Sequence, residues 1–238
     1  MKLLEGERAL VTGGARGIGR GMVQALREEG AQVLGADIEE ADVRCDLSSG
    51  AGARALAEEA IRRLGSVSLF VHCASPRRQE SETVLEVSEA QWREMLAVNL
   101  DAAFVLCQAL GRHMVERGIK GRMLLTTSLH AESPRNLPHY SAAKAGETML
   151  VKELARALGP RGIRVNAIAP GAIPGGGFNA PPGMVEKIPL RRFGTPADVA
   201  AMAVALLSER FGAYVTGTTV VVDGGIVLHN WIEPPSFG

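Results

Sequence analysis

Cysteine, aromatic side chains and excess charge of either sign are scarce in this chain of 238 residues. Its three cysteines, Cys45, Cys73 and Cys107, are widely spaced and form no C-x-x-C pair, which argues against a disulfide framework and a zinc site. Basic and acidic residues balance at 26 each, so the chain lacks the basic field that holds a nucleic acid. We therefore expect reduced thiols, no metal site and no nucleic-acid partner.

Long apolar runs are lacking as well. We find no apolar run near the roughly 20 residues of a membrane helix and no apolar core of a signal peptide at the start. The 46% hydrophobic residues, 28 glycines and 12 prolines are close to ordinary globular usage, which excludes a disordered or collagen-like chain. We expect a cytoplasmic protein without a membrane partner, folded as a single domain over residues 1–238.

Short β-branched runs alternate with longer helical patterns along the chain. The runs that predict strands are 8–12, 32–37, 69–73, 122–127, 164–169 and 219–222, and the patterns that predict helices are 17–29, 52–63, 88–115, 140–158 and 196–207. Several of the strand runs are almost wholly apolar, as expected where helices cover both faces of a parallel sheet. The order predicts an α/β fold with a doubly wound (Rossmann) parallel sheet of seven strands.

Two segments stand outside this alternation. The stretch 171–189 is irregular and contains Gly-Gly-Gly and several prolines, which is more typical of a lid or binding loop than of a domain boundary. The tail 226–238 carries Trp231 and Phe237 without a helical pattern, and we expect these aromatic side chains to dock on a surface.

A glycine-rich turn joins the first predicted strand to the first predicted helix. It reads TGGARGIG from Thr12 to Gly19. Glycine clusters also occur in ordinary tight turns, but here backbone N–H groups and the helix N-terminus would face a pyrophosphate. The turn therefore predicts a nucleotide site.

An acidic residue ends the second predicted strand. Asp37 lies where a carboxylate can accept hydrogen bonds from an adenosine ribose, and it would repel a 2′-phosphate, which favours NAD over NADP. Arg16 in the glycine-rich turn supports the opposite choice, because its side chain could meet a phosphate. A purely structural role for Asp37 in a turn is the remaining alternative.

Tyr140 and Lys144 are four residues apart at the start of a predicted helix, so both side chains lie on one face. A phenol is a poor acid or base at neutral pH, but a neighbouring ammonium stabilises its phenolate and lets it exchange a proton with a substrate oxygen. Such pairs are common on helix surfaces. Here Ser128 stands twelve residues upstream, at the end of the predicted strand 122–127, with Thr127 as the alternative hydroxyl.

The chain resembles the short-chain dehydrogenase/reductase family over nearly its whole length. The motifs that carry the resemblance are the T-G-x-x-x-G-x-G turn at Thr12, the Y-x-x-x-K pair at Tyr140, WREMLAVNL ending at Leu100, NAIAPG from Asn166, PLRRFGTPADV from Pro189, YVTG from Tyr214 and VDGG from Val222. The resemblance implies an NAD(P)-dependent oxidoreductase that acts on CH–OH groups and assembles as a homotetramer. The apolar content of 88–115 exceeds one buried stripe and independently favours a symmetric oligomer.

The resemblance also implies roles for individual residues. The catalytic residues would be Asn99, Ser128, Tyr140 and Lys144, with the Asn99 backbone helping to hold a water between the lysine and solvent. The cofactor-binding residues would be Gly13, Arg16, Gly17, Ile18, Gly19, Asp37, Asp46, Leu47, Ala74, Ser75, Tyr140, Lys144, Pro170, Gly171 and Ile173. Asp46 is also a candidate helix N-cap, an alternative that the sequence leaves open.

The sequence departs from the family pattern at two places. His72-Cys73-Ala74-Ser75 stands where the family usually has Asn-Asn-Ala-Gly, so we expect the hydrogen bonds that brace this strand to be lost. Pro174-Gly175 stands where a threonine often touches the nicotinamide carboxamide, which predicts one missing contact.

Two histidines flank the catalytic residues in the sequence. His130 and His139 would suit a polar substrate such as a sugar, polyol or hydroxyacid, although both could be exposed loop residues without a role. The proposed function is NAD-dependent hydride transfer between nicotinamide and a secondary alcohol or ketone. An NADPH-dependent 3-oxoacyl thioester reductase and a catalytically silent nucleotide-binding sensor are the alternatives. A serine hydrolase is disfavoured because the chain has no G-x-S-x-G elbow.

Overall fold

A computed structural model describes residues 2–77, 82–175, 178 and 180–228. Within these residues the strands are β1 (Arg8–Thr12), β2 (Gln32–Asp37), β3 (Val43–Arg44), β4 (Leu69–His72), β5 (Arg122–Thr126), β6 (Arg164–Pro170) and β7 (Thr219–Val222). The helices are α1 (Gly17–Glu28), α2 (Gly50–Leu64), α3 (Glu89–Leu96), α4 (Ala102–Glu116), α5 (Pro138–Leu158), α6 (Pro196–Leu207) and α7 (Glu209–Gly212). Trp231 and Phe237 lie outside the described residues, so their docking stays a prediction.

The strands form one parallel sheet in the order β3-β2-β1-β4-β5-β6-β7. This confirms the predicted doubly wound fold, and β3 is the strand for which the apolar runs had given no range. It pairs with β2 through two residues, Val43 and Arg44, which is too short for a pattern to reveal. The chain order reverses between β1 and β4, and in such sheets ligands bind beyond the carboxyl ends of the strands at this reversal.

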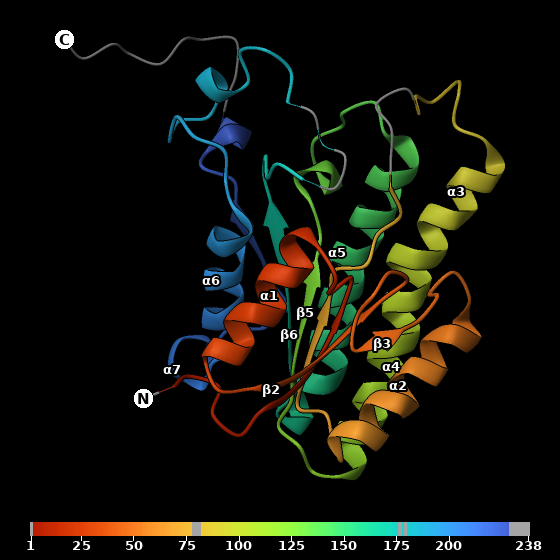
Figure 1. The fold of residues 1–238 in the computed structure, drawn as a ribbon, viewed down its shortest axis with the longest axis vertical. Helices are drawn as coiled ribbons and strands as arrows, with labels where there is room; N and C mark the ends of the chain where they lie inside the picture. Colours follow the sequence, from red (N-terminus) through yellow and green to blue (C-terminus); the bar gives the residue numbers. More distant parts are fainter. Residues whose placement is uncertain (1, 78–81, 176–177, 179, 229–238) are drawn as a thin grey trace.

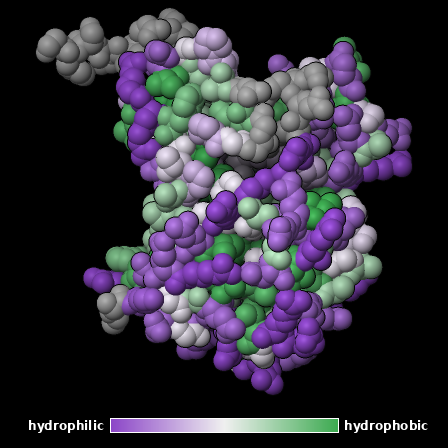
Figure 2. All heavy atoms as spheres, viewed as in Figure 1, coloured by the Kyte–Doolittle hydropathy of each residue, from purple (hydrophilic) through white to green (hydrophobic). Residues whose placement is uncertain are grey.

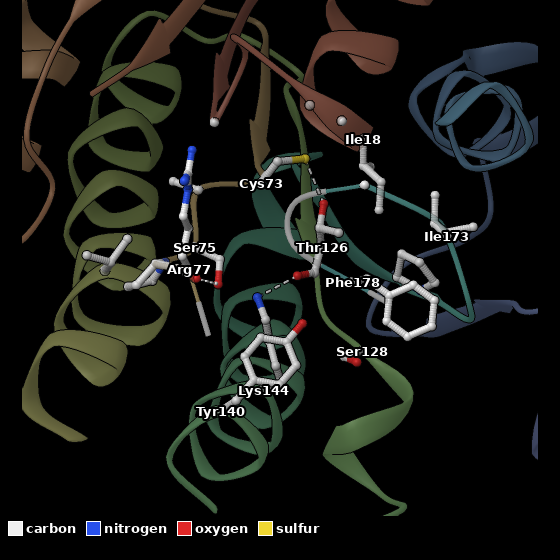
Figure 3. A pocket seen from close by; sticks show the side chains of 18 of the residues that line it. Ile18, Cys73, Ser75, Arg77, Thr126, Ser128, Tyr140, Lys144, Ile173 and Phe178 are labelled. Carbon is white, nitrogen blue, oxygen red and sulfur yellow. Dashed lines mark hydrogen bonds between the residues drawn. The ribbon is translucent and has the colours of Figure 1, made fainter. Parts of the chain in front are cut away.

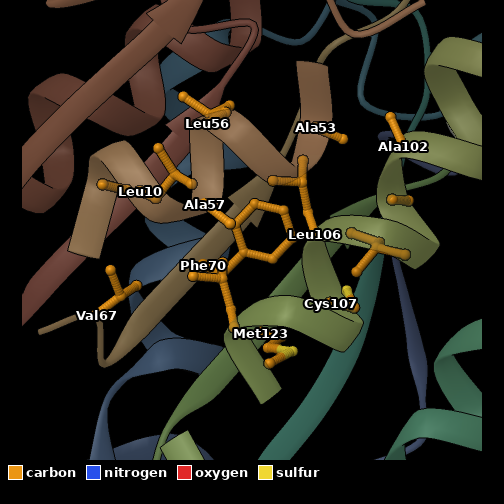
Figure 4. Packing of buried hydrophobic residues seen from close by; sticks show 14 of the residues in the cluster. Leu10, Ala53, Leu56, Ala57, Val67, Phe70, Ala102, Leu106, Cys107 and Met123 are labelled. Carbon is orange, nitrogen blue, oxygen red and sulfur yellow. The ribbon is translucent and has the colours of Figure 1, made fainter. Parts of the chain in front are cut away.

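Helices cover both faces of the sheet (Figure 1), and each face has its own hydrophobic core. Successive side chains of a strand point to opposite faces of the sheet and so enter different cores. Phe70 of β4 packs under α2, α4 and α5, while Leu69 and Val71 pack under α1 and α6. Figure 4 shows Phe70 at the centre of the first core, surrounded by side chains from the sheet and the covering helices. Since both faces are covered, the central strands are buried along most of their length and consist mainly of apolar residues.

The helical pattern predicted over 88–115 is divided by a π-helical turn, η1 (Ala97–Asp101). Ser88 caps α3 through a hydrogen bond from the Gln91 backbone N–H, and α4 continues after the turn. By length and composition the stretch Glu89–Glu116 could cross a membrane, contrary to our expectation that no segment would qualify. In this fold α4 covers the sheet, with Ala103, Leu106 and Leu110 fully buried in the core.

Hydrophilic side chains cover most of the face seen in Figure 2, and smaller apolar areas lie between them. Individual large apolar side chains are nevertheless exposed. They include Phe104 on α4 (46% exposed), Met149 on α5 (56%) and Val221 on β7 (47%).

Candidate active site

A cavity of about 1050 Å³ lies beyond the carboxyl ends of the strands. Its wall comes from the turn after β1, the end of β2, the segments after β4, β5 and β6, and the first turns of α5. Its volume is at the upper end of the roughly 300–1,000 Å³ typical of ligand pockets. In Figure 3, Tyr140 and Lys144 reach upward from one helix, Ser128 lies beside them, and Ile18, Ile173 and Phe178 stand across the cavity.

The glycine-rich turn is folded tightly against the segment after β4. Gly13 has a φ of +68°, and a Cβ there would lie 2.8 Å from the carbonyl of Cys73. A Cβ on Gly19 would overlap the carbonyl oxygen of Gly13. Both positions therefore require glycine, which leaves the turn with a backbone surface.

The N-terminus of α1 opens on this surface. Gly17, Ile18 and Gly19 line the cavity, and no side chain caps the helix, whereas Ser49 caps α2 and Thr195 caps α6. The first N–H groups of α1 and its dipole are thus available to a phosphate. The turn fits the pyrophosphate of a dinucleotide.

Asp37 lies at the end of β2 on the wall of the same cavity. Its carboxylate accepts hydrogen bonds from the backbone N–H of Ala15 (3.0 Å) and of Glu39 (3.1 Å), so it also ties the glycine-rich turn to β2. Arg16 forms an ion pair with Glu39, and Arg77 lies 3.3 Å from the same carboxylate. Asp37 and Glu39 together therefore balance the two arginines at this end of the cavity.

Asp46 and Leu47 lie farther along the same wall. Asp46 accepts a hydrogen bond from the backbone N–H of Ser48 at 2.8 Å, and this bond lowers the pKa of its carboxyl. The N-cap of α2 is Ser49, so the N-cap alternative for Asp46 is wrong. Leu47 is buried against the cavity, where an apolar surface suits a flat adenine ring.

Tyr140 and Lys144 occupy the first turns of α5, which begins at Pro138, two residues earlier than predicted. The Lys144 ammonium lies 5.6 Å from the centroid of the Tyr140 ring, and both side chains line the cavity while being more than 90% buried. Lys144 Nζ donates a hydrogen bond to the Thr126 carbonyl oxygen at 2.8 Å, which fixes it against the end of β5.

The structure distinguishes between the two candidate hydroxyls. Thr127 turns its Oγ1 to the Ile168 carbonyl oxygen of β6 at 3.1 Å, so it serves the sheet. Ser128 caps the 3-10 turn η2 (Leu129–Ala131) and accepts a hydrogen bond from the His130 N–H at 3.2 Å. Its hydroxyl is directed to the cavity beside Tyr140 (Figure 3).

Asn99 lies behind the cavity wall in η1. Its side-chain amide donates to the Met95 carbonyl oxygen at 2.9 Å, while its Oδ1 finds no hydrogen-bond partner among the described residues. The neighbouring Val98, and not Asn99, lines the cavity. π-Turns change the direction of backbone carbonyls and occur often at functional sites, which favours a backbone role for Asn99. This role stays a prediction.

His72 restores the bracing that its substitution was expected to remove. Its Nδ1 lies 2.9 Å from Thr12 Oγ1 on β1, and its Nε2 lies 3.2 Å from the Val98 carbonyl oxygen in η1. Burial lowers the pKa of this imidazole to about 3, with Lys144 adding to the shift, so the ring is neutral. Cys73 adds a contact of 2.9 Å between its Sγ and Thr126 Oγ1.

The other predicted cofactor residues surround the same space. Ala74 and Ser75 follow β4, Pro170 ends β6, and Gly171 and Ile173 follow it; all of them line the cavity. Pro174, Gly175, Phe178 and Pro181 show that the described part of the loop 171–189 also forms the wall, while residues 176, 177 and 179 lie outside the described residues.

The two histidines separate in space. His130 lines the cavity, and its ring packs edge-on against Tyr140 with 5.2 Å between the ring centroids. His139 is 1% exposed, lies 3.1 Å from a carboxylate oxygen of Glu82 and is not among the cavity-lining residues. The expectation that both histidines face the substrate is therefore corrected for His139, whose position on α5 turns it into the protein.

Two acidic residues escaped the sequence reasoning. Glu39 follows Asp37 by two residues, and only the folding of α1 against β2 shows that it pairs with Arg16. Glu147 is fully buried and pairs with Lys144. It could have been found from the helical phase, because it stands four residues after the buried Ala143 and four before the buried Val151.

The comparisons with known proteins agree with this geometry. Residues 13–227 match the family model described as enoyl-(acyl carrier protein) reductase. The chain is 33% identical to glucose 1-dehydrogenase 2 of Bacillus subtilis (strain 168), with 96% of this chain and 97% of the relative covered. It is 32% identical to the 3-oxoacyl-acyl-carrier-protein reductase of Chlamydia pneumoniae, with coverages of 94% and 98%.

Among solved structures, a short-chain dehydrogenase/reductase from Serratia marcescens matches with a TM-score of 0.86 and 27% identity, covering 94% of this chain and 99% of that one. The chain belongs to the short-chain dehydrogenase/reductase family. It is an oxidoreductase of the class that uses a nicotinamide dinucleotide and acts on an alcohol or ketone.

Proposed function

We propose that the protein is an NAD-dependent dehydrogenase that oxidises a secondary alcohol of a small polar substrate such as a sugar, polyol or hydroxyacid. The observation that carries this proposal is the convergence of Ser128, Tyr140 and Lys144 on one cavity whose far end is bordered by Asp37 and Glu39. A catalytically silent sensor would need the glycine-rich turn but not the hydroxyl, phenol and ammonium at the other end.

The residues divide the chemistry among them. The dinucleotide, when bound, supplies a nicotinamide that accepts a hydride. In oxidation, Tyr140 takes the proton from the substrate hydroxyl, Ser128 donates a hydrogen bond to the reacting oxygen, and Lys144 stabilises the phenolate by its charge. Asn99 and a water at its backbone would connect the lysine to solvent.

The choice of NAD rests on charge. Asp37 and Glu39 both border the cavity, and a 2′-phosphate placed against two carboxylates would be repelled. Arg16 and Arg77, which could otherwise meet that phosphate, are both paired with Glu39. The same charge balance disfavours the NADPH-dependent 3-oxoacyl thioester reductase.

An acidic acyl carrier would also need a basic surface near the cavity. Two arginine pairs, Arg77-Arg78 and Arg191-Arg192, could form such a surface if they came together. Arg77 pairs with Glu39, Arg192 pairs with Asp198, and Arg191 donates to the Glu186 carbonyl oxygen. Only Arg77 of these three lines the cavity among the described residues, and Arg78 lies outside them. Relatives of both activities match the chain, so this comparison of charges supports the dehydrogenase.

The test is turnover with NAD and with NADP on a panel of sugars, polyols, hydroxyacids and a 3-hydroxyacyl thioester, followed by the absorbance of reduced nicotinamide. We expect the highest kcat/KM with NAD and a polar secondary alcohol. The Tyr140→Phe variant serves as the blank for contaminating activity. Faster turnover of the thioester with NADP would establish the alternative.

We further propose that the enzyme is a cytoplasmic homotetramer. Its three cysteines are free, which suits a reducing compartment, and Phe104, Met149 and Val221 place exposed apolar side chains on α4, α5 and the edge strand β7. Light scattering should give about four times the chain mass of 25.2 kDa. A mass of one chain at micromolar concentration would contradict this.

A further inference from the structure

A carboxylate is buried directly behind the catalytic lysine. Glu147 is 0% exposed and stands one helical turn after Lys144 in α5, on the same stripe as Ala143 and Val151. It does not line the cavity. A buried carboxylate is costly unless a charged partner compensates it, so the contacts of Glu147 need an explanation.

Those contacts are directed at one atom. Lys144 Nζ lies 2.9 Å from Glu147 Oε2 and 3.2 Å from Oε1, and 2.8 Å from the Thr126 carbonyl oxygen. Among the described residues, Lys144 donates the hydrogen bonds to this carboxylate. An ammonium has three N–H donors, so with one donor shared between the two Glu147 oxygens and one given to Thr126, one donor is left for the cavity.

The neighbouring titratable groups are neutral near pH 7. Burial raises the pKa of the Cys73 thiol after β4 to about 11, and burial, with a further contribution from Glu147, raises that of the Cys107 thiol on α4. The imidazole of His72 on β4 is neutral because burial, with a further contribution from the charge of Lys144, lowers its pKa to about 3. Lys144 and Glu147 thus carry the charge of this cluster.

We propose that Glu147 is a positioning residue that holds the Lys144 ammonium at the cavity and, through its own charge, sets how strongly this ammonium stabilises the Tyr140 phenolate. The proposal rests on the proposed function for its catalytic meaning. The ionised carboxylate compensates the ammonium and weakens its effect on the phenol, whereas a neutral side chain leaves the ammonium uncompensated.

The sign of the pH effect follows from the titration of Glu147. Burial raises the pKa of its carboxyl to about 7, and the neighbouring Lys144 limits this rise. Below that pH the protonated carboxyl leaves the ammonium uncompensated. Above it the carboxylate opposes ionisation of the phenol, so removal of its charge has the largest effect in alkaline solution.

The chain offers a direct spectroscopic test, because it contains two tyrosines and the other one, Tyr214, is fully exposed. In a Tyr214→Phe background, the ultraviolet absorbance of tyrosinate reports Tyr140 alone. Introducing Glu147→Gln in this background keeps the side-chain size and an oxygen that accepts from Lys144. We expect the pH midpoint of the signal to fall by about one unit, the effect of one charge several ångströms away.

The matched control is Glu153→Gln, which removes an exposed carboxylate from the same helix and should leave the midpoint unchanged. Glu147→Leu is the second variant: it should also lower the midpoint, and it should weaken NADH binding more than Glu147→Gln because no acceptor holds Lys144. An unchanged midpoint in both folded Glu147 variants would overturn the proposal. The titration needs no substrate. A protein that turns over nothing on the panel would therefore refute the proposed function, and the tyrosinate titration could still be interpreted.

Discussion

The two ends of the cavity are built from different materials. At the end that we propose for the adenosine of the cofactor (the adenosine end), the glycine-rich turn presents backbone N–H groups, and partly or fully exposed charged side chains such as Arg16 and Glu39 surround them. At the catalytic end, the wall consists of buried side chains, with Ser128, Tyr140 and Lys144 each less than 10% exposed. Binding at the first end depends on the path of the backbone, whereas the chemistry at the second end depends on a few side-chain atoms.

The difference predicts how each end responds to substitution. Solvent screens the charges at the adenosine end, so a charge change there should alter only the preference between NAD and NADP. Removal of one atom at the catalytic end should instead abolish the proton-transfer step. Variants that act on one end alone test whether the two are independent.

The largest effect is expected from Tyr140→Phe, which keeps the ring and its packing and removes the hydroxyl that we propose carries the proton. If general acid–base transfer supplies roughly 10²- to 10⁴-fold of the rate, kcat should fall by at least that factor, while the Kd for NADH changes only a few fold. Turnover on the best substrate and fluorescence titration of NADH measure the two quantities.

Tyr214→Phe is the matched control, because it makes the same change at a fully exposed position and should leave both quantities intact. Lys144→Met should differ from both by losing rate and NADH affinity together. Retained turnover in Tyr140→Phe would transfer the proton step to another group, and His130, whose ring packs on Tyr140, would be the first candidate.

An intermediate effect is expected from Asp37→Ala. The loss of one carboxylate should raise the ratio of kcat/KM with NADP to that with NAD by about ten- to a hundredfold, or about 1.4 to 2.8 kcal/mol. Both cofactors should also bind more weakly, since Asp37 holds the Ala15 N–H of the glycine-rich turn. Steady-state kinetics with each cofactor provide the measurement.

Glu40→Ala is the control for this experiment, because Glu40 is exposed and does not line the cavity. An unmutated enzyme that already prefers NADP would refute the assignment of Asp37. If Asp37→Ala also lowered kcat with NAD by orders of magnitude, the two ends of the cavity would not be independent.

The smallest effect is expected from His72→Asn and concerns stability. Because burial lowers the pKa of His72 from the usual 6.5 to about 3, the unfolded chain binds a proton between these pH values that the native chain does not. Stability contributed above pH 6.5 is therefore lost as the pH falls through this window. The variant should lose less of its melting temperature between pH 7 and pH 5, by a few degrees.

The control is His113→Asn, which changes a partly exposed histidine on α4 and should alter this pH dependence less. Equal pH dependence in His72→Asn and the unmutated chain would show that other groups control acid unfolding.

Local patterns predicted the strongest elements well, for physical reasons. The strands β1, β2 and β7 have the predicted bounds, because each is a short run of apolar and β-branched residues between turn residues. The π-turn at Ala97–Asp101 was missed because it changes the hydrogen-bond pattern within a continuous helical sequence. Strand β3 was missed because two residues show no periodicity.

The sequence by itself determined the doubly wound sheet, the glycine-rich turn and the pairing of Tyr140 with Lys144 on one helix face, because each depends on short-range spacing or on apolar periodicity. Only the tertiary structure decided that His72 braces β4, that His139 turns away from the cavity and that Glu39 engages Arg16. These outcomes depend on which side chains meet across elements distant in sequence and on how much water reaches them, and no local spacing encodes either.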